Sequence, residues 1–272
     1  MNQGLVAAKN ATPAACMIRL KTKEEDGCFI PIALYLTSMQ NKEKKQGIVA
    51  GISLVIMAIV AGFSFGYAHN SLAAESPEIT LNNLTANKSL FFAELSGWIL
   101  IFFADIIVAI ALYFFFRSTS KRISMIAALI RIVYTLILGI AIIQLFKIIP
   151  VLSFDNPLSE KLSALEIASH IQLFEKFWSV GLIIFGFHLI GLGYLSVQSK
   201  SIHWLLGYLL YFGGISYTFI NSSRQLSLFD TQTLNSAENI LALPMALAEI
   251  LLAFWLIYIG YRKSPSKSNH RK

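Results

Sequence analysis

The chain has 272 residues, of which 56% are hydrophobic and 14% are charged, and its mean hydropathy is positive. This composition excludes an ordinary soluble domain and indicates a polytopic membrane protein. The formal net charge of +7 would suit a nucleic-acid partner, but the basic residues lie in short segments between apolar blocks. There they act as topology signals, so we expect no nucleic-acid binding.

The N-terminal segment, residues 1–46, is mixed in character and differs from the long apolar blocks after it. Its apolar piece CFIPIALYLTSM is shorter than the roughly 20 residues that a spanning helix needs. The piece is either an interfacial segment or, as we favour, part of a stretch 1–38 that lies upstream of a true start at Met39. Cys16 and Cys28 also lie here, and no histidine is spaced to complete a zinc site, so we expect no metal.

The rest of the chain is a series of apolar blocks long enough to cross about 30 Å of hydrocarbon as helix. The sequence therefore predicts an all-α, polytopic membrane helix bundle of six transmembrane helices over residues 47–261, with a basic cytoplasmic tail over 262–272. No cleavable signal peptide precedes the first block, so we expect that block to be retained. The predicted helices are residues 48–68, 90–116 (or from 95), 123–152, 171–197, 203–220 and 240–261.

Lysine and arginine are distributed unevenly among the connections between these blocks. They gather in 42–45, 117–122 and 262–272 and at Lys200, which all lie on one side of a six-helix arrangement, whereas the opposite connections are net acidic. Basic residues in short connections are retained on the cytoplasmic side. We therefore expect both termini in the cytoplasm, the cell membrane as location and the lipid bilayer as partner.

The first predicted helix carries two pairs of glycines at a spacing of four residues. Gly47 pairs with Gly51, and Gly62 pairs with Gly66. Small residues at this spacing let another helix approach closely. The sequence thus predicts helix contacts along both pairs.

Four charged or ionisable residues lie inside the predicted spans. Counted from the basic cytoplasmic ends at about 1.5 Å per residue, they share a layer at depths of roughly 13 to 20 Å. A charge near the bilayer centre costs about 2.5 to 3.5 kcal/mol on insertion scales, so each needs a partner or a task. Small side chains line the same helix faces, which predicts that these faces meet other helices. The residues are Asp105, Arg131, His188 and Glu249, with Tyr134 and Tyr194 as candidate neighbours.

Two interpretations of this layer stay open. In the first, Asp105 and Arg131 form a buried ion pair that fixes helix packing, His188 is hydrogen-bonded nearby and Glu249 is protonated. In the second, the layer lines a partly hydrated cavity in which an acid takes up protons and His188 relays them. Arg131 would then hold an anionic group or set the proton affinity of the acids. A transporter uses such a layer near the midplane.

Other charges lie near the outer ends of the helices, where interface anchoring is the simpler role. Glu94 begins the second helix, and Glu175 could pair with Lys147 across the third and fourth. The tryptophans fit an aromatic belt at the interfaces. They are Trp98, Trp178, Trp204 and Trp255.

The histidines argue against a haem cofactor. His69 and His170 lie near the outer surface and His203 near the inner surface, so only His188 is central. Two axial histidines at one depth are therefore missing. GxSxG, HExxH and P-loop motifs are also missing, so we expect no enzyme activity and no cofactor.

Five segments carry a resemblance to a known family: AGISLVIMAIVAGFSFGYAHNSL, ADIIVAIALYFFFR, LIRIVYTLILGIA, FGFHLIGLGYLSVQS and LLGYLLYFGGISYTF. Over about residues 45–261, the chain resembles the domain of unknown function 4386 family of bacterial and archaeal membrane proteins. The resemblance implies a multi-pass membrane protein and places Asp105, Arg131, His188 and Tyr194 on positions of the family pattern. It implies no activity. Residues 1–38 have no counterpart in the family, which agrees with a start at Met39.

Glu249 lies outside the resembling segments, so its assignment rests on depth and spacing alone. Taken together, these features favour an integral membrane protein that acts without covalent chemistry, as a small-solute or proton-coupled permease. The main alternative is a structural or accessory membrane protein in which the layer only sets helix packing. The second alternative is a membrane-embedded enzyme or redox partner.

Overall fold

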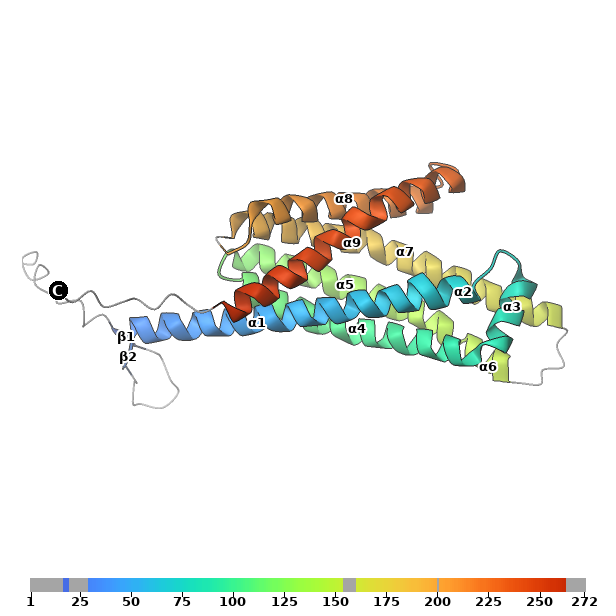
Figure 1. The fold of residues 1–272 in the computed structure, drawn as a ribbon, viewed down its shortest axis with the longest axis horizontal. Helices are drawn as coiled ribbons and strands as arrows, with labels where there is room; N and C mark the ends of the chain where they lie inside the picture. Colours follow the sequence, from blue (N-terminus) through green and yellow to red (C-terminus); the bar gives the residue numbers. More distant parts are fainter. Residues whose placement is uncertain (1–16, 20–28, 154–159, 200, 263–272) are drawn as a thin grey trace, which may run out of the picture.

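A computed structural model describes residues 17–19, 29–153, 160–199 and 201–262 of the chain. Cys16, Cys28 and Lys200 lie outside the described residues, as does the tail after Arg262. The described part is an elongated bundle of long helices that run along one axis (Figure 1). The prediction of an all-α bundle is therefore confirmed, apart from one short pair of strands near the N-terminus.

The two strands pair antiparallel, with Ile18 opposite Ile30, and the helices come after them in the order shown in Figure 1. The elements are β1 (Met17–Arg19), β2 (Phe29–Pro31), α1 (Ile32–Ala61), the π-helix η1 (Gly62–His69), α2 (Asn70–Leu72), α3 (Pro77–Ala86), α4 (Lys88–Phe116), α5 (Lys121–Phe146), α6 (Ile148–Ser153), α7 (Glu160–Gln198), α8 (Trp204–Gln225) and α9 (Thr231–Tyr261).

Five helical segments of the described chain are long and apolar enough to cross a membrane. The sixth predicted span corresponds to α8, which has 22 residues. It mixes its apolar residues with glycine, serine and asparagine, so it is long enough but not apolar enough to be counted with these five. The five segments are Lys42–Leu72, Lys88–Phe116, Lys121–Leu152, Lys161–Gln198 and Gln232–Tyr261.

Several helices are longer than predicted, because they continue past the apolar block that identified them. α1 begins at Ile32, α7 at Glu160 and α9 at Thr231. For α9 the reason is a cap: the Asp230 carboxylate accepts the Thr233 backbone N–H at 2.9 Å and so starts the helix within a polar sequence. Hydropathy marks the part of a helix that suits lipid, whereas capping decides where it begins.

The long helices form a closed ring. α1 packs on α4, α4 on α5, α5 on α7, α7 on α8, α8 on α9, and α9 returns to α1. α3 lies against α7 at one end of the bundle, which we call the outer end (Figure 1). Every long helix thus presents one face to a common axis and the opposite face outward.

Close contacts in this ring occur where glycines remove side chains. A Cβ on Gly186 or Gly214 would meet the other residue's carbonyl oxygen at 2.5 or 2.6 Å, so both let α7 and α8 touch backbone to backbone. A Cβ on Gly51 would meet the Ala253 carbonyl oxygen of α9 at 2.6 Å, which confirms the first predicted glycine pair. The second pair was wrong: no described atom lies within 4 Å of a Cβ placed on Gly62 or Gly66.

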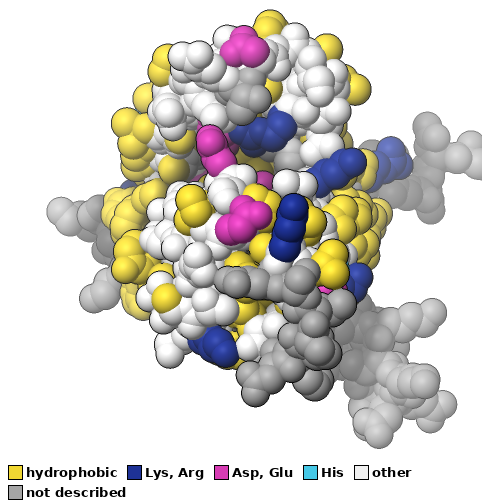
Figure 2. Space-filling view, turned by 90° about the vertical axis from the view of Figure 1, so that its right-hand side faces the viewer, with side chains coloured by type: hydrophobic (Ala, Val, Ile, Leu, Met, Phe, Trp, Pro, Cys, Tyr) yellow, Lys and Arg dark blue, Asp and Glu magenta, His cyan; other side chains and the backbone are white. Residues whose placement is uncertain are grey.

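The outward faces of the helices carry large apolar side chains. Leu136, Phe103 and Ile215 are each more than half exposed. Figure 2 looks onto the outer end, where charged side chains are visible among backbone and side chains of other types, whereas hydrophobic side chains cover the flanks. Apolar flanks of this extent suit contact with lipid tails rather than water, so the chain has the surface of a membrane protein.

Candidate functional site

The helices meet in a polar layer on the axis of the ring, which we call the axial layer. Each of the six long helices contributes at least one side chain to it, and the residues predicted from depth, Asp105, Arg131, His188 and Glu249, all belong to it. Its members are Met57 of α1, Asp105 of α4, Arg131 of α5, Phe185 and His188 of α7, Tyr217 of α8 and Glu249 of α9.

Arg131 is the centre of the axial layer and is fully buried. Its Nη2 lies 2.6 Å from Asp105 Oδ1, and its Nη1 lies 3.1 Å from His188 Nε2. The guanidinium also sits 5.3 Å from the ring centroid of Phe185 and 3.8 Å from the Met57 sulfur. One cation therefore connects four helices, through charge, hydrogen bonding and the face of an aromatic ring.

The contacts of His188 define its protonation. Its Nδ1 lies 2.9 Å from the Ala127 carbonyl oxygen, which can only accept, so Nδ1 carries a proton. Its Nε2 faces the Arg131 guanidinium, which can only donate, so Nε2 must accept. His188 is therefore a neutral imidazole with its proton on Nδ1.

The ion pair leaves some polar atoms of the axial layer without a hydrogen bond. Asp105 Oδ2 and Arg131 Nε are buried and have no partner among the described residues. Asp105 Oδ1 also makes no well-aligned hydrogen bond, although it touches the Arg131 Nη2, so its contact there is ionic. Buried polar atoms of native proteins are almost always paired with protein or water, and these atoms could accept or donate to a small polar ligand.

The remaining predicted residues divide into two groups. Glu249 is partly exposed and accepts a long hydrogen bond from Tyr217 at 3.4 Å. Tyr134 is buried against Phe185, with ring centroids 5.0 Å apart, and so lies beside the axial layer. Tyr194 is 43% exposed, so the structure places it on the outward face of α7 and away from the axis.

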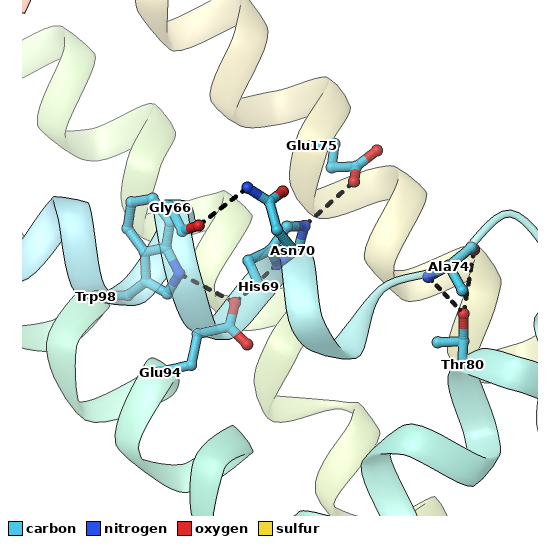
Figure 3. Close-up of polar contacts among 8 residues, drawn as sticks. All are labelled: Gly66, His69, Asn70, Ala74, Thr80, Glu94, Trp98 and Glu175. Atoms are coloured by element: carbon cyan, nitrogen blue, oxygen red, sulfur yellow. Dashed lines mark hydrogen bonds and ion pairs between the residues drawn. The ribbon is translucent and has the colours of Figure 1, made fainter.

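A second cluster, which we call the outer triad, lies closer to the outer end (Figure 3). His69 is buried, with Nδ1 2.8 Å from Glu94 Oε1 and Nε2 3.1 Å from Glu175 Oε1. The Trp98 indole N–H also donates to Glu94 Oε1, at 3.3 Å. The triad joins η1, α4 and α7.

Aromatic rings surround the imidazole of the outer triad. Phe65 stacks on His69 with centroids 5.5 Å apart, and Phe174 lies 5.3 Å away. Trp98 and Trp178 pack edge-on against each other beside them. These rings exclude water from His69 on the sides that the carboxylates do not cover.

Comparison with known proteins shows the family of the chain. The sequence model of a family described as a domain of unknown function, DUF4386, matches residues 49–260. The chain belongs to the DUF4386 family. A relative from Archaeoglobus fulgidus, described as an uncharacterized protein, is 31% identical to this DUF4386 chain over 168 residues, which cover 62% of this chain and 84% of the relative. No solved structure matches the chain.

The match with the DUF4386 family includes both clusters, since every member of the axial layer and the outer triad lies between residues 49 and 260. The family description adds no activity to them, so their chemistry is inferred from geometry. In the described residues of this DUF4386 protein, no group of three histidine, cysteine, aspartate or glutamate side chains could hold a metal ion. In the triad the reason is plain, because the carboxylates lie at opposite nitrogens of one ring.

The outer triad was missed by sequence reasoning, which assigned Glu94 and Glu175 to interface anchoring and only placed His69 near the outer surface. Glu175 forms its described ion contact with His69, so the predicted pairing with Lys147 was wrong. Trp98 is 1% exposed and does not belong to an aromatic belt. The signal was present: Glu94 and Glu175 both lie roughly 33 to 35 Å along their helices from the C-terminal ends of α4 and α7.

Proposed function

We propose that all six long helices, α8 included, cross the membrane, with both termini in the cytoplasm. The Lys44 Nζ donates to the Arg262 carbonyl oxygen at 2.7 Å, so the start of the first span and the end of the last lie together. An odd number of crossings would separate them. The basic residues in 42–45 and 117–122 support a cytoplasmic assignment for this end.

The course of α8 supports its membrane crossing. At the inner end the Trp255 indole N–H donates to the Ser201 carbonyl oxygen, just before α8 begins. At the other end Gln225 donates to the Lys176 carbonyl oxygen of α7. α8 therefore runs antiparallel to α7 and covers the same depth as His188. Its polar residues Ser216, Asn221 and Ser223 are buried against neighbouring helices, away from lipid.

The function that the geometry supports best is a proton-coupled permease for a small polar solute. The single observation that carries this proposal is the axial layer: six helices converge on polar groups of which Asp105 Oδ2 and Arg131 Nε have no hydrogen-bond partner among the described residues. Arg131 would position an anionic or polar group of the solute, and Asp105 and Glu249 are the acids that would exchange protons. Glu249 is the less buried of the two acids, since it is partly exposed whereas Asp105 is fully buried.

A structural role is the second candidate, and the burial of the ion pair favours it. Asp105 and Arg131 are both fully buried and contact each other at 2.6 Å. A pair of this kind can fix the packing of α4 against α5 without moving anything. No specific observation favours an enzyme or a redox partner.

Access of water to the axial layer separates these two functions. Met57 touches Arg131, so a Met57→Cys variant with Cys16 and Cys28 replaced by serine should react with a charged, water-soluble thiol reagent in liposomes. Leu136→Cys, at a position that is 59% exposed on the lipid-facing side of α5, is the matched control and should not react, because the reactive thiolate forms in water. A folded Met57→Cys variant that fails to react would support the structural role and contradict the permease.

A further inference from the structure

The outer triad forms a row that leads from the surface into the bundle. The Glu175 side chain is 50% exposed, the His69 side chain is 4% exposed and the Glu94 side chain is 2% exposed. Each member contacts the next at 2.8 to 3.1 Å, as Figure 3 shows. Groups at these distances lie within reach of direct proton transfer.

The charges of the row favour the presence of a mobile proton. Both nitrogens of His69 face carboxylate oxygens, and ionised carboxylates can only accept. With both acids ionised, the ring satisfies both carboxylates by carrying two protons, and this state, which holds the mobile proton, keeps one net negative charge. In the described residues, the charged groups that act on His69 are Glu94 from α4 and Glu175 from α7, and none comes from α1, α2 or η1 itself.

Local structure places His69 between these acids. The helix widens into the π-helix η1 over Gly62–His69, and π-helical turns recur at functional sites because they redirect side chains. On the facing helix, a Cβ at Gly97 would collide with the Ser64 hydroxyl of η1. The missing side chain at Gly97 lets η1 approach α4 closely, one turn from Glu94.

We propose that Glu175, His69 and Glu94 form a proton-transfer row through which Glu94 exchanges protons with water at the outer end of the bundle. In the row without its mobile proton, His69 is a neutral imidazole that carries its proton on Nδ1, and its Nε2 is free to accept. Water protonates Glu175, which passes the proton to His69 Nε2, so that the ring becomes an imidazolium and Glu175 a carboxylate again. The imidazolium then gives its Nδ1 proton to Glu94, which becomes a neutral carboxylic acid, while the Nε2 proton stays on the ring. The reverse steps return the proton to water, so one proton is conserved throughout.

This inference deepens the proposed function and rests on it only for the use made of the proton. Glu94 and Asp105 lie on the same helix, about 16 Å apart along its axis. α4 therefore carries both Glu94, which receives the proton, and Asp105, the acid of the axial layer. Trp98, also on α4, donates a hydrogen bond to Glu94 and packs on Trp178 of α7. In a permease, the row would take up a proton from the water at the outer end, and the movement of that proton would drive transport of the solute.

Time-resolved infrared spectroscopy tests the row in the full chain in lipid nanodiscs. A light-triggered proton donor acidifies the solution, and the carboxylic acid band that Glu94→Gln removes reports the loading of Glu94. We expect Glu175→Gln to slow this loading by at least about 10-fold, because proton relays of this kind contribute large rate factors. Glu78→Gln is the matched control, since Glu78 is an exposed acid of α3 at the same end, and it should leave the rate unchanged.

His69→Phe should slow the loading as strongly while it keeps an aromatic ring among Phe65 and Phe174. If this variant fails to fold, Glu175→Gln decides alone, because its amide oxygen still accepts the His69 N–H at a half-exposed position. Absence of a Glu94 band, or an unchanged rate in Glu175→Gln, would overturn the row. Neither result affects the thiol test of the axial layer, and Asp105→Asn should leave Glu94 loading intact, so failures of the two proposals are distinguishable.

Discussion

At the scale of single residues, the protein concentrates its buried charge on one guanidinium. Arg131 lies 2.6 Å from Asp105 and 3.1 Å from His188, and all three are almost fully buried. Sequence depth predicted that these residues share a layer, and the structure places them in contact. One of the two interpretations of the layer included this ion pair, but depth alone could not decide between them, because helix rotation decides which side chains at one depth face each other.

Removal of either member of the ion pair should destabilise the protein. Asp105→Ala and Arg131→Ala each leave one buried charge without its partner, which costs about 3 to 5 kcal/mol. The double variant leaves neither charge and should recover much of the loss, so the two costs should not add. Thermal unfolding of the four proteins in one detergent measures this. If the stability losses of the two single variants simply add in the double variant, the interaction between Asp105 and Arg131 contributes nothing to stability.

At the scale of helices and their contacts, hydropathy located the spans well and glycine spacing located contacts only in part. Both pairs in the first helix looked alike in sequence, yet only Gly47 and Gly51 face α9. The reason is η1, whose wider turns rotate the end of the helix. Nothing in the composition of GFSFGYAH distinguishes it from an α-helix, so this rotation, and the resulting position of His69, could not be predicted.

The contact between α7 and α8 depends on glycine and should fail when a methyl group is added. A Cβ on Gly186 would collide with the Thr218 hydroxyl and meet the Gly214 carbonyl oxygen at 2.5 Å. We expect Gly186→Ala to lower the melting temperature in detergent. Gly62→Ala is the control, because that Cβ meets nothing and alanine gains about 0.5 to 1 kcal/mol of helix propensity. Equal melting temperatures for both variants would contradict the close packing.

The cap of α9 should make a pH-dependent contribution to stability. Hydrogen bonds from the Thr233 hydroxyl and backbone N–H hold the pKa of Asp230 below its ordinary value of 3.8. Such a group stabilises the fold above its unfolded pKa, and the contribution is lost as the pH falls through the folded pKa. Asp230→Ala should therefore melt earlier than the wild type at neutral pH. The difference should vanish as the pH falls below 3.8, and a constant difference would contradict the cap.

At the scale of the whole molecule, six helices close into a ring around one polar layer, with a second polar cluster near the outer end. The number of long helices was predictable from apolar blocks, and the family from its motifs. The order of the helices around the ring could not be predicted, because it depends on contacts between helices far apart in sequence, such as that between α1 and α9. α8 is not apolar enough to be counted with the other five spans because it contains glycine, serine and asparagine, several of which are buried against its neighbours.

The six-span topology makes a two-sided labelling prediction. In intact cells, a membrane-impermeant thiol reagent should label Ala86→Cys on α3 and leave Ser118→Cys between α4 and α5 unlabelled. Both positions are exposed, so they differ only in the side of the membrane. Both should be labelled once the membrane is opened with detergent. Labelling of the Ser118→Cys variant in intact cells would invert the proposed orientation.

The central claim is that the axial layer receives water or a small polar ligand. A cryo-electron microscopy map of the protein in nanodiscs, at a resolution that shows ordered water, tests it most directly. We predict density within hydrogen-bonding distance of Asp105 Oδ2 and Arg131 Nε, connected by further density to one face of the bundle. A layer with side-chain density alone around Arg131 and its neighbours would contradict the permease and leave the ion pair as a packing element.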